Sequence, residues 1–281
     1  MNNIANAFKH GKAFIAFLTA GDPTIEKTEE FILEAVRGGA DLIEIGIPFS
    51  DPIAEGIVIQ EADIRALRSG TTPDKIFAMV ARLRKKTDVP LVFMSYVNPL
   101  FHYGFDAFFA KCAEVGIDGV ILPDVPYEEK EEIRETAEKH GVAVISMIAP
   151  TSEQRIAEIA KNASGFMYVV SSLGVTGVRS EIQTDLPAIL DVVRRSSDIP
   201  AAVGFGISTP EQARKISQCC DGVIVGSAIV RIIAQYGEAA GPKVYEYVKS
   251  MVNAINNYQL ILFPPNCSRG ADSGIMRKNI M

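Results

Sequence analysis

The chain has 281 residues, a formal net charge of −6 and 48% hydrophobic residues. This length fits one domain of roughly 250 residues with a short extension, and the hydrophobic content is enough for a large core. The acidic balance argues against nucleic-acid binding, which needs basic patches, but backbone dipoles can still bind a small phosphorylated ligand.

The cysteines and histidines form no pattern typical of a metal site. Cys112, Cys219, Cys220 and Cys267 contain no C-x-x-C pair, and the three histidines are scattered. We therefore expect no bound metal and reduced thiols that serve in packing. Reduced thiols are typical of a cytoplasmic protein, which is the location we expect.

Eight short apolar runs alternate with longer amphipathic segments. We expect strands at residues 13–19, 41–47, 90–96, 118–124, 142–148, 165–170, 200–206 and 221–227. Several runs are apolar on both faces, as strands of a buried parallel sheet are. Helices are expected between them: residues 24–38 have helical spacing, Thr72 and Pro73 begin a second helix, and Thr209 with Gln212 predicts a capping box.

Strands that alternate with helices predict an α/β protein, a single-domain (β/α)8 TIM barrel. A doubly wound open sheet is the alternative, which periodicity alone separates poorly. We assign residues 1–258 to the barrel, with an N-terminal and a C-terminal helix. Residues 259–281 are expected to form a disordered or irregular tail, because the end of the chain is rich in Pro, Asn, Ser and Gly without periodicity.

Glu44 lies inside the second apolar run, between Leu42 and Ile47. Because side chains alternate between the faces of a strand, the isoleucines of this run would pack on helices while Glu44 points into the barrel. Loss of water raises the pKa of a carboxyl group, as a general acid or base requires near neutral pH. The alternative is a buried Glu paired with a Lys or Arg elsewhere in the chain.

Three acids follow strands, where a barrel carries its active site. Asp51 and Glu55 lie in the loop after the second strand, and Asp124 ends the fourth. Each of the three also has a structural explanation. Asp51 could be a turn residue before proline, and Glu55 could be a solvated loop acid. Asp124 has the same ambiguity between a site acid and a loop acid.

Glycine-bearing turns follow the three last strands, at residues 174–177, 204–206 and 226–227. Turns after the seventh and eighth strands of phosphate-binding barrels offer backbone N–H groups and a helix N-terminus to the phosphate. Glycine permits a close approach of backbone to ligand. Plain tight turns would explain each motif singly, but their succession favours a phosphate site.

Six motifs together resemble the tryptophan synthase alpha family. They occupy residues 17–23, 44–52, 123–126, 172–177, 204–208 and 226–230, in family order from about residue 3 to about residue 256. The resemblance implies retro-aldol cleavage of indole-3-glycerol phosphate to indole and glyceraldehyde 3-phosphate. It places the family's acid/base glutamate on Glu44. The second carboxylate, which stabilises positive charge on the indole nitrogen, falls on Glu55.

The same resemblance implies the rest of the site. Backbone groups of Gly177, Gly206, Gly226 and Ser227 would hold the phosphate, and Gly204 belongs to the same turns. Thr176 would lie on a closing lid. The indole ring would be surrounded by Phe17, Met94, Tyr96, Ile121, Tyr168, Phe205 and Ile224. The family's alpha subunit has no cofactor of its own; it pairs with a pyridoxal-phosphate beta subunit, expected here as an αββα heterotetramer.

The sequence departs from the family near the second carboxylate. The family has Asp where this chain has Glu55, and Gly-Pro-Thr or Gly-Pro-Val where it has residues 56–58. The tail beyond about residue 260 matches nothing in the family. One alternative is therefore a catalytically weak barrel that mainly binds and activates the beta subunit. Another is a different phosphate-handling barrel enzyme, but such an enzyme would need an acid/base pair that the first strand does not offer.

Overall fold

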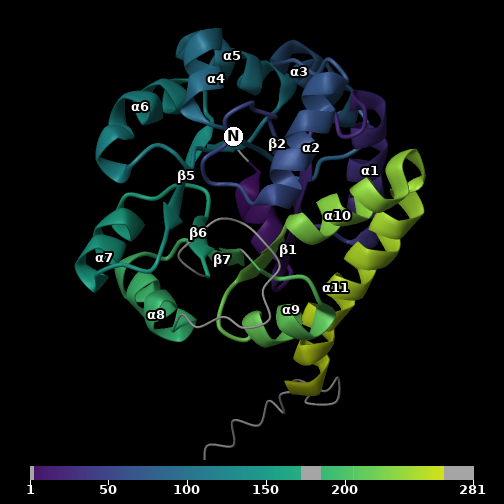
Figure 1. The fold of residues 1–281 in the computed structure, drawn as a ribbon. Coiled ribbons are helices and arrows are strands. Elements are labelled where there is room, and N and C mark those ends of the chain that lie inside the picture. The colour runs from purple at the N-terminus through teal and green to yellow at the C-terminus, as the bar shows by residue number, and fades with distance from the viewer. Residues whose placement is uncertain (1–2, 172–184, 205, 263–281) are drawn as a thin grey trace, which may run out of the picture.

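The computed structural model describes residues 3–171, 185–204 and 206–262. Eight parallel strands close into a barrel in chain order, with β1 paired to both β2 and β8, and helices surround them (Figure 1). The predicted (β/α)8 barrel is confirmed. The doubly wound alternative is wrong, because β1 pairs with β8 and closes the sheet, whereas an open sheet has two edge strands that do not pair with each other.

The strands are shorter than the apolar runs, since the ends of each run pass into loops. They are β1 (Ala13–Thr19), β2 (Leu42–Gly46), β3 (Leu91–Met94), β4 (Gly119–Ile121), β5 (Ala143–Ile148), β6 (Met167–Val170), β7 (Ala201–Gly204) and β8 (Gly222–Val225).

The helices form the outer layer, with three short 3-10 turns. The helices are α1 (Ile25–Gly38), α2 (Ile57–Arg68), α3 (Pro73–Leu83), α4 (Val97–Tyr103), α5 (Phe105–Val115), α6 (Glu131–Lys139), α7 (Glu153–Lys161), α8 (Leu186–Ser196), α9 (Pro210–Ile216), α10 (Ser227–Tyr236) and α11 (Gly241–Leu262). The turns are η1 (Ile4–Phe8), η2 (Tyr127–Glu129) and η3 (Gly237–Ala239).

Side-chain caps begin the helices at the positions that the sequence indicated. Thr24 and Thr72 accept hydrogen bonds from backbone N–H groups at the starts of α1 and α3. Thr209 and Gln212 form the predicted capping box of α9. Such caps satisfy N–H groups that the first turn of a helix leaves without a partner.

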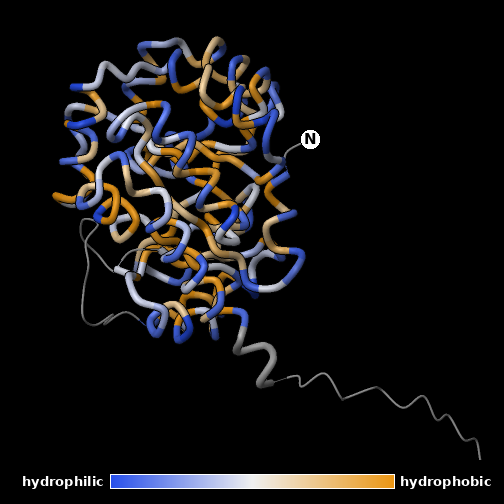
Figure 2. The backbone as a smooth tube through the Cα atoms, turned by 90° about the vertical axis from the view of Figure 1, so that its right-hand side faces the viewer, coloured by the Kyte–Doolittle hydropathy of each residue, from blue (hydrophilic) through white to orange (hydrophobic). Residues whose placement is uncertain are grey.

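The apolar core has two layers. An outer layer lies between strands and helices and includes Ile43 and Ile45, while an inner layer fills the barrel and includes Ile15, Leu42 and Val92. Figure 2 shows hydrophobic stretches gathered in the interior and hydrophilic ones at the periphery. The alternation around Glu44 is therefore as expected, with the isoleucines facing the helices.

At the C-terminal end, α11 packs against α1 and α9 and runs to Leu262, past the predicted boundary at residue 258. Most of the predicted tail, from residue 263 onward, lies outside the described residues, so the domain limits stay a prediction. In the described ranges, we find no helix that combines the length and apolar character needed to cross a membrane.

Candidate active site

A cavity lies at the carboxyl ends of the strands, where a barrel of this type carries its active site. Its walls are mostly apolar, and Glu44 and Glu55 are its only acidic side chains among the described residues. The residues that line it are Phe17, Glu44, Ala54, Glu55, Ile59, Met94, Pro123, Met147, Tyr168, Gly206, Ile207, Ile224, Gly226 and Ser227.

Glu44 enters the cavity from the middle of the barrel wall. It pairs in register with Phe17 of β1 and Val92 of β3, and its side chain is 1% exposed. Neither carboxyl oxygen has a hydrogen-bond partner among the described residues. None of those residues is therefore the Lys or Arg that a structural ion pair with Glu44 would need. Burial raises the pKa of Glu44 to about 8. The carboxyl is therefore mostly protonated at neutral pH and can give up a proton.

Glu55 is held by a hydrogen-bond chain. Its carboxylate accepts a hydrogen bond from the Tyr96 hydroxyl, whose oxygen accepts one from the backbone N–H of Ala54 at 2.8 Å. Burial raises the pKa of Glu55, the Tyr96 hydroxyl lowers it, and the charge of Asp124 raises it. Two carboxyls of one cavity thus have different surroundings, since Glu55 has a donor and Glu44 has none.

The other two loop acids have structural positions. Asp124 accepts hydrogen bonds from the backbone N–H of Val97 at 3.1 Å, at the first residue of α4. Asp51 is exposed and accepts a hydrogen bond from its neighbour Ser50. Neither lines the cavity, so Glu55 is the loop acid best placed to act in it.

A further carboxyl lies behind Glu55. Asp63, on the buried face of α2, is only 6% exposed, and burial, then the charges of Glu55 and Asp22, raise its pKa to about 8. Arg65 on the same helix donates two hydrogen bonds of 2.8 Å to the Asp22 carboxylate and so does not pair with Asp63. Asp63 is therefore neutral at neutral pH. Its burial could not be predicted from the sequence, because an acid in an amphipathic helix normally faces solvent.

The glycine-bearing turns border the cavity on one side. Gly226 is the N-cap of α10, Ser227 is its first residue, and both line the cavity with Gly206. Gly206 has a φ of +76°, a conformation that L side chains rarely adopt. A Cβ on Gly226 would come within 3.2 Å of the Phe17 ring. The turn thus brings the amino end of a helix close to the cavity.

The remaining site predictions divide into three groups. Phe17, Met94, Tyr168 and Ile224 line the cavity as the indole walls were expected to. Tyr96, Ile121 and Gly204 do not: Tyr96 reaches Glu55, Ile121 belongs to the inner core, and a Cβ on Gly204 would meet the Tyr168 hydroxyl at 2.6 Å. Thr176, Gly177 and Phe205 lie outside the described residues.

Five lining residues were missed: Ala54, Ile59, Pro123, Met147 and Ile207. Met147 had a usable signal, since it pairs with Tyr168 and shares the inward face of β5 with Ala143 and Ile145. Ile59 comes from α2, and no strand pattern could have placed it. In the described part of the chain, no three His, Cys, Asp or Glu side chains are arranged to hold a metal ion.

Comparison with known proteins gives consistent matches. The family model "Tryptophan synthase alpha chain" matches residues 4–258. The tryptophan synthase alpha chain of Lacticaseibacillus casei is 45% identical over 256 residues, covering 91% of this chain and 96% of the relative. The Lactiplantibacillus plantarum protein of the same name is 46% identical over 257 residues, covering 91% and 97%.

Solved structures are similar over the same extent. The tryptophan synthase subunit alpha of Legionella pneumophila superposes with a TM-score of 0.84 at 37% identity and covers 92% of this chain and 99% of its own. A chain of the tryptophan synthase complex of Pyrococcus furiosus superposes with a TM-score of 0.80 at 35% identity, covering 86% and 99%.

Proposed function

The chain belongs to the tryptophan synthase alpha chain family, whose members cleave indole-3-glycerol phosphate to indole and glyceraldehyde 3-phosphate, and we propose that Glu44 and Glu55 carry out this cleavage here. The observation that supports these roles is the contrast between the two carboxyls. Glu44 is buried without a hydrogen-bond partner among the described residues, whereas Glu55 accepts a hydrogen bond from Tyr96.

Glu44 acts as the general acid and then as the base. It gives its proton to the ring carbon that carries the side chain, and positive charge develops on the indole nitrogen. It then takes the proton of the adjacent side-chain hydroxyl, whose oxygen becomes the carbonyl of glyceraldehyde 3-phosphate. The carbon–carbon bond breaks and its electrons return to the ring. Glu44 therefore ends in the protonation state in which it began.

Glu55 supplies the negative charge that the ring nitrogen needs. Burial raises the pKa of Glu55, and the hydrogen bond from Tyr96 opposes this shift by favouring the carboxylate form. A carboxylate fixed beside developing positive charge stabilises the transition state more than the ground state.

The phosphate end and the ring end of the substrate meet different surfaces. The start of α10, at Gly226 and Ser227, and the turn at Gly206 would present N–H groups to the phosphate, since a helix N-terminus carries partial positive charge. The flat ring would lie between apolar side chains, with Phe17 and Tyr168 among them. The family motif alone assigns Thr176 to the closing lid and Gly177 to the phosphate site.

The partner follows from relatives that have been solved as complexes. One Pyrococcus furiosus structure concerns the mutual activation of the tryptophan synthase α2β2 complex. We propose that this chain likewise pairs with a beta subunit as an αββα heterotetramer. Pyridoxal phosphate belongs to the beta subunit, and the alpha family has no cofactor of its own. A biosynthetic enzyme of this family is proposed to work in the cytoplasm.

The loop after β2 decides between an active enzyme and a barrel that mainly activates its partner. Ile57 is the first residue of α2 and is 66% exposed. Proline is well accepted at this helix position, so the family's proline would fit and stiffen the loop. Because misplacement of about 1 Å can cost roughly 10²-fold, we expect slow cleavage by the chain alone and faster cleavage with the beta subunit.

The test is indole release from indole-3-glycerol phosphate, measured with and without a beta subunit. We compare the parent with Glu55→Ala, Glu55→Asp and Glu55→Asp/Ile57→Pro. Glu55→Ala should lose most activity in both conditions, and full activity of this variant with the partner would refute the role of Glu55. A double variant faster than the parent would mean that the loop is imperfectly adapted, and a slower Glu55→Asp would mean that the longer side chain is matched to its loop.

A further inference from the structure

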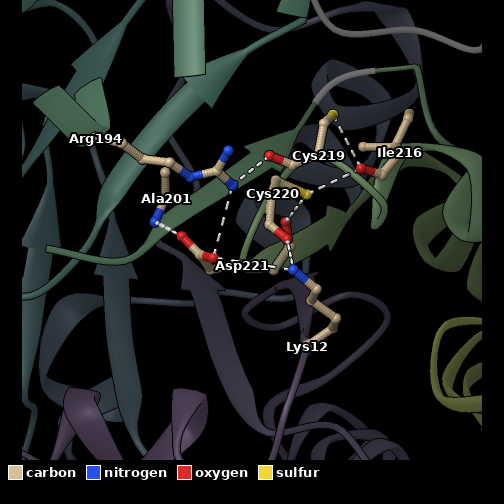
Figure 3. A network of polar contacts seen from close by, with 8 residues as sticks. Lys12, Arg194, Ala201, Ile216, Cys219, Cys220 and Asp221 are labelled. Carbon is tan, nitrogen blue, oxygen red and sulfur yellow. Dashed lines mark hydrogen bonds and ion pairs between the residues drawn. The ribbon is translucent and has the colours of Figure 1, made fainter. Parts of the chain in front are cut away.

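A second group of reactive side chains lies at the end of the barrel opposite the cavity (Figure 3). Cys219 and Cys220 connect α9 to β8, just before the first residue of that strand. Lys12 immediately precedes β1, and Arg194 comes from the last turn of α8. None of these residues takes part in the proposed cleavage, so the cluster is a separate feature.

The two thiols are held together by backbone carbonyls. The sulfur atoms of Cys219 and Cys220 lie 3.2 Å and 3.3 Å from the same oxygen, the carbonyl of Ile216. Cys220 also lies 3.0 Å from the carbonyl oxygen of Gly222. Cys220 is fully buried, while Cys219 is half-buried. Cys219 is thus the outer member of the pair, with Cys220 beneath it.

Positive charge flanks the pair. Arg194 donates to the carbonyl oxygen of Cys219 at 2.5 Å, and Lys12 donates to that of Cys220 at 2.6 Å. The one carboxylate in the network, Asp221, lies 3.9 Å from Arg194 and 4.0 Å from Lys12 and accepts from the backbone N–H of Ala201. Two cations and one carboxylate leave the network with a net positive charge.

This environment favours the thiolate form of Cys219. A hydrogen bond from the Cys220 thiol, with Arg194 and Lys12, lowers the pKa of the Cys219 thiol to about 7, although burial opposes ionisation. The pKa of Cys220 moves in the opposite direction, because Cys220 is the hydrogen-bond donor and is more deeply buried. A thiol that ionises near ambient pH attacks disulfides most effectively, since it combines a large thiolate fraction with good nucleophilicity.

We propose that Cys219 is a reversible thiol-modification site that reacts with anionic low-molecular-weight disulfides, of which oxidised glutathione is the probe. The Cys219 thiolate attacks one sulfur of the disulfide and forms a mixed disulfide. The other sulfur leaves as a thiolate, which takes a proton from water. Lys12 and Arg194 attract the carboxylates of the incoming molecule, and Cys220 remains a thiol. A second exchange with a free thiol restores Cys219.

The charge requirement gives a test on the unaltered protein. The full chain is incubated at neutral pH with oxidised glutathione or with cystamine, a cationic disulfide, and conjugates are located by peptide mass spectrometry. Cys219 should react with oxidised glutathione at least about five-fold faster than with cystamine. Two unit charges about 4 Å apart in water change a rate by about that factor. Cys112, which is fully buried, serves as the internal control and should stay unmodified.

The thiol pair gives an independent test. The rate of Cys219 alkylation by iodoacetamide is followed against pH in the parent, in Cys220→Ala and in Cys220→Ser. Removal of the donor in Cys220→Ala should move the midpoint upward by about one pH unit, whereas serine keeps a donor and should move it less. The proposal is overturned if Cys219 reacts with oxidised glutathione no faster than in the urea-unfolded chain, or if cystamine reacts as fast.

Discussion

Replacement of Glu44 by Gln should change stability and activity in opposite directions. Burial moves the pKa of Glu44 from 4.5 to about 8. Between these values the folded protein binds a proton that the unfolded chain has lost, so the parent loses stability as pH rises. At 1.36 kcal/mol per pKa unit, the parent loses about 3 kcal/mol between about pH 5 and about pH 8 through this group. Gln cannot ionise, so the variant escapes this loss.

Urea unfolding of both proteins across this pH range measures the difference directly, and indole release measures the activity. We expect Glu44→Gln to gain stability relative to the parent as pH rises, while turnover falls by about 10²–10⁴-fold. Asp41→Asn, just before the first residue of β2, is the matched control. Asp41 has a pKa raised to about 6 and accepts from Phe14, so this variant should show only about 1 kcal/mol over the same range, with normal turnover. A pH-independent stability difference for Glu44→Gln, or near-normal turnover, would refute the reasoning.

Two further predictions concern the groups around Glu55. Tyr96→Phe removes the donor that favours the Glu55 carboxylate, so kcat should fall about ten-fold and the acidic limb of its pH profile should move to higher pH; an unmoved limb would contradict the role of Tyr96. Asp63→Asn removes a carboxyl whose pKa is raised to about 8, so the variant should gain stability over the parent between about pH 5 and about pH 8, measured by urea unfolding. Equal gains at both pH values would mean that Asp63 ionises normally.

The barrel and its principal acid could be predicted because they depend on local patterns. Runs that are apolar on both faces mark strands covered on both sides, and alternation along residues 41–47 sets the direction of Glu44 without tertiary information. Helix caps are equally local, and Thr24, Thr72 and Thr209 begin helices as expected. Contacts within one strand or one helical turn are thus readable from the sequence.

Contacts between distant segments were harder to predict. The hydrogen bond of Tyr96 to Glu55 joins two residues 41 positions apart in the chain, and the family resemblance placed Tyr96 at the wall around the indole ring instead. Asp63 looks like an ordinary surface acid until α2 packs on the barrel and brings it beside Glu55. The position of Ile121 in the inner core shows the same limit, since strand alternation gives the direction of a side chain but not its depth.

Depth and partners together give the two proposed catalytic carboxyls, Glu44 and Glu55, different chemistry. Glu44 is surrounded by inner-core side chains and has no donor among the described residues, so its neutral form is favoured and it can donate a proton. Glu55 lies in a loop, where Tyr96 donates to it and favours the ion. A single residue type can therefore supply both the proton and the counter-charge, because the backbone places one copy within a strand and the other after it. Asp63 has a raised pKa like Glu44, but its place on α2 keeps it out of the cavity lining, so it is not proposed to act on the substrate.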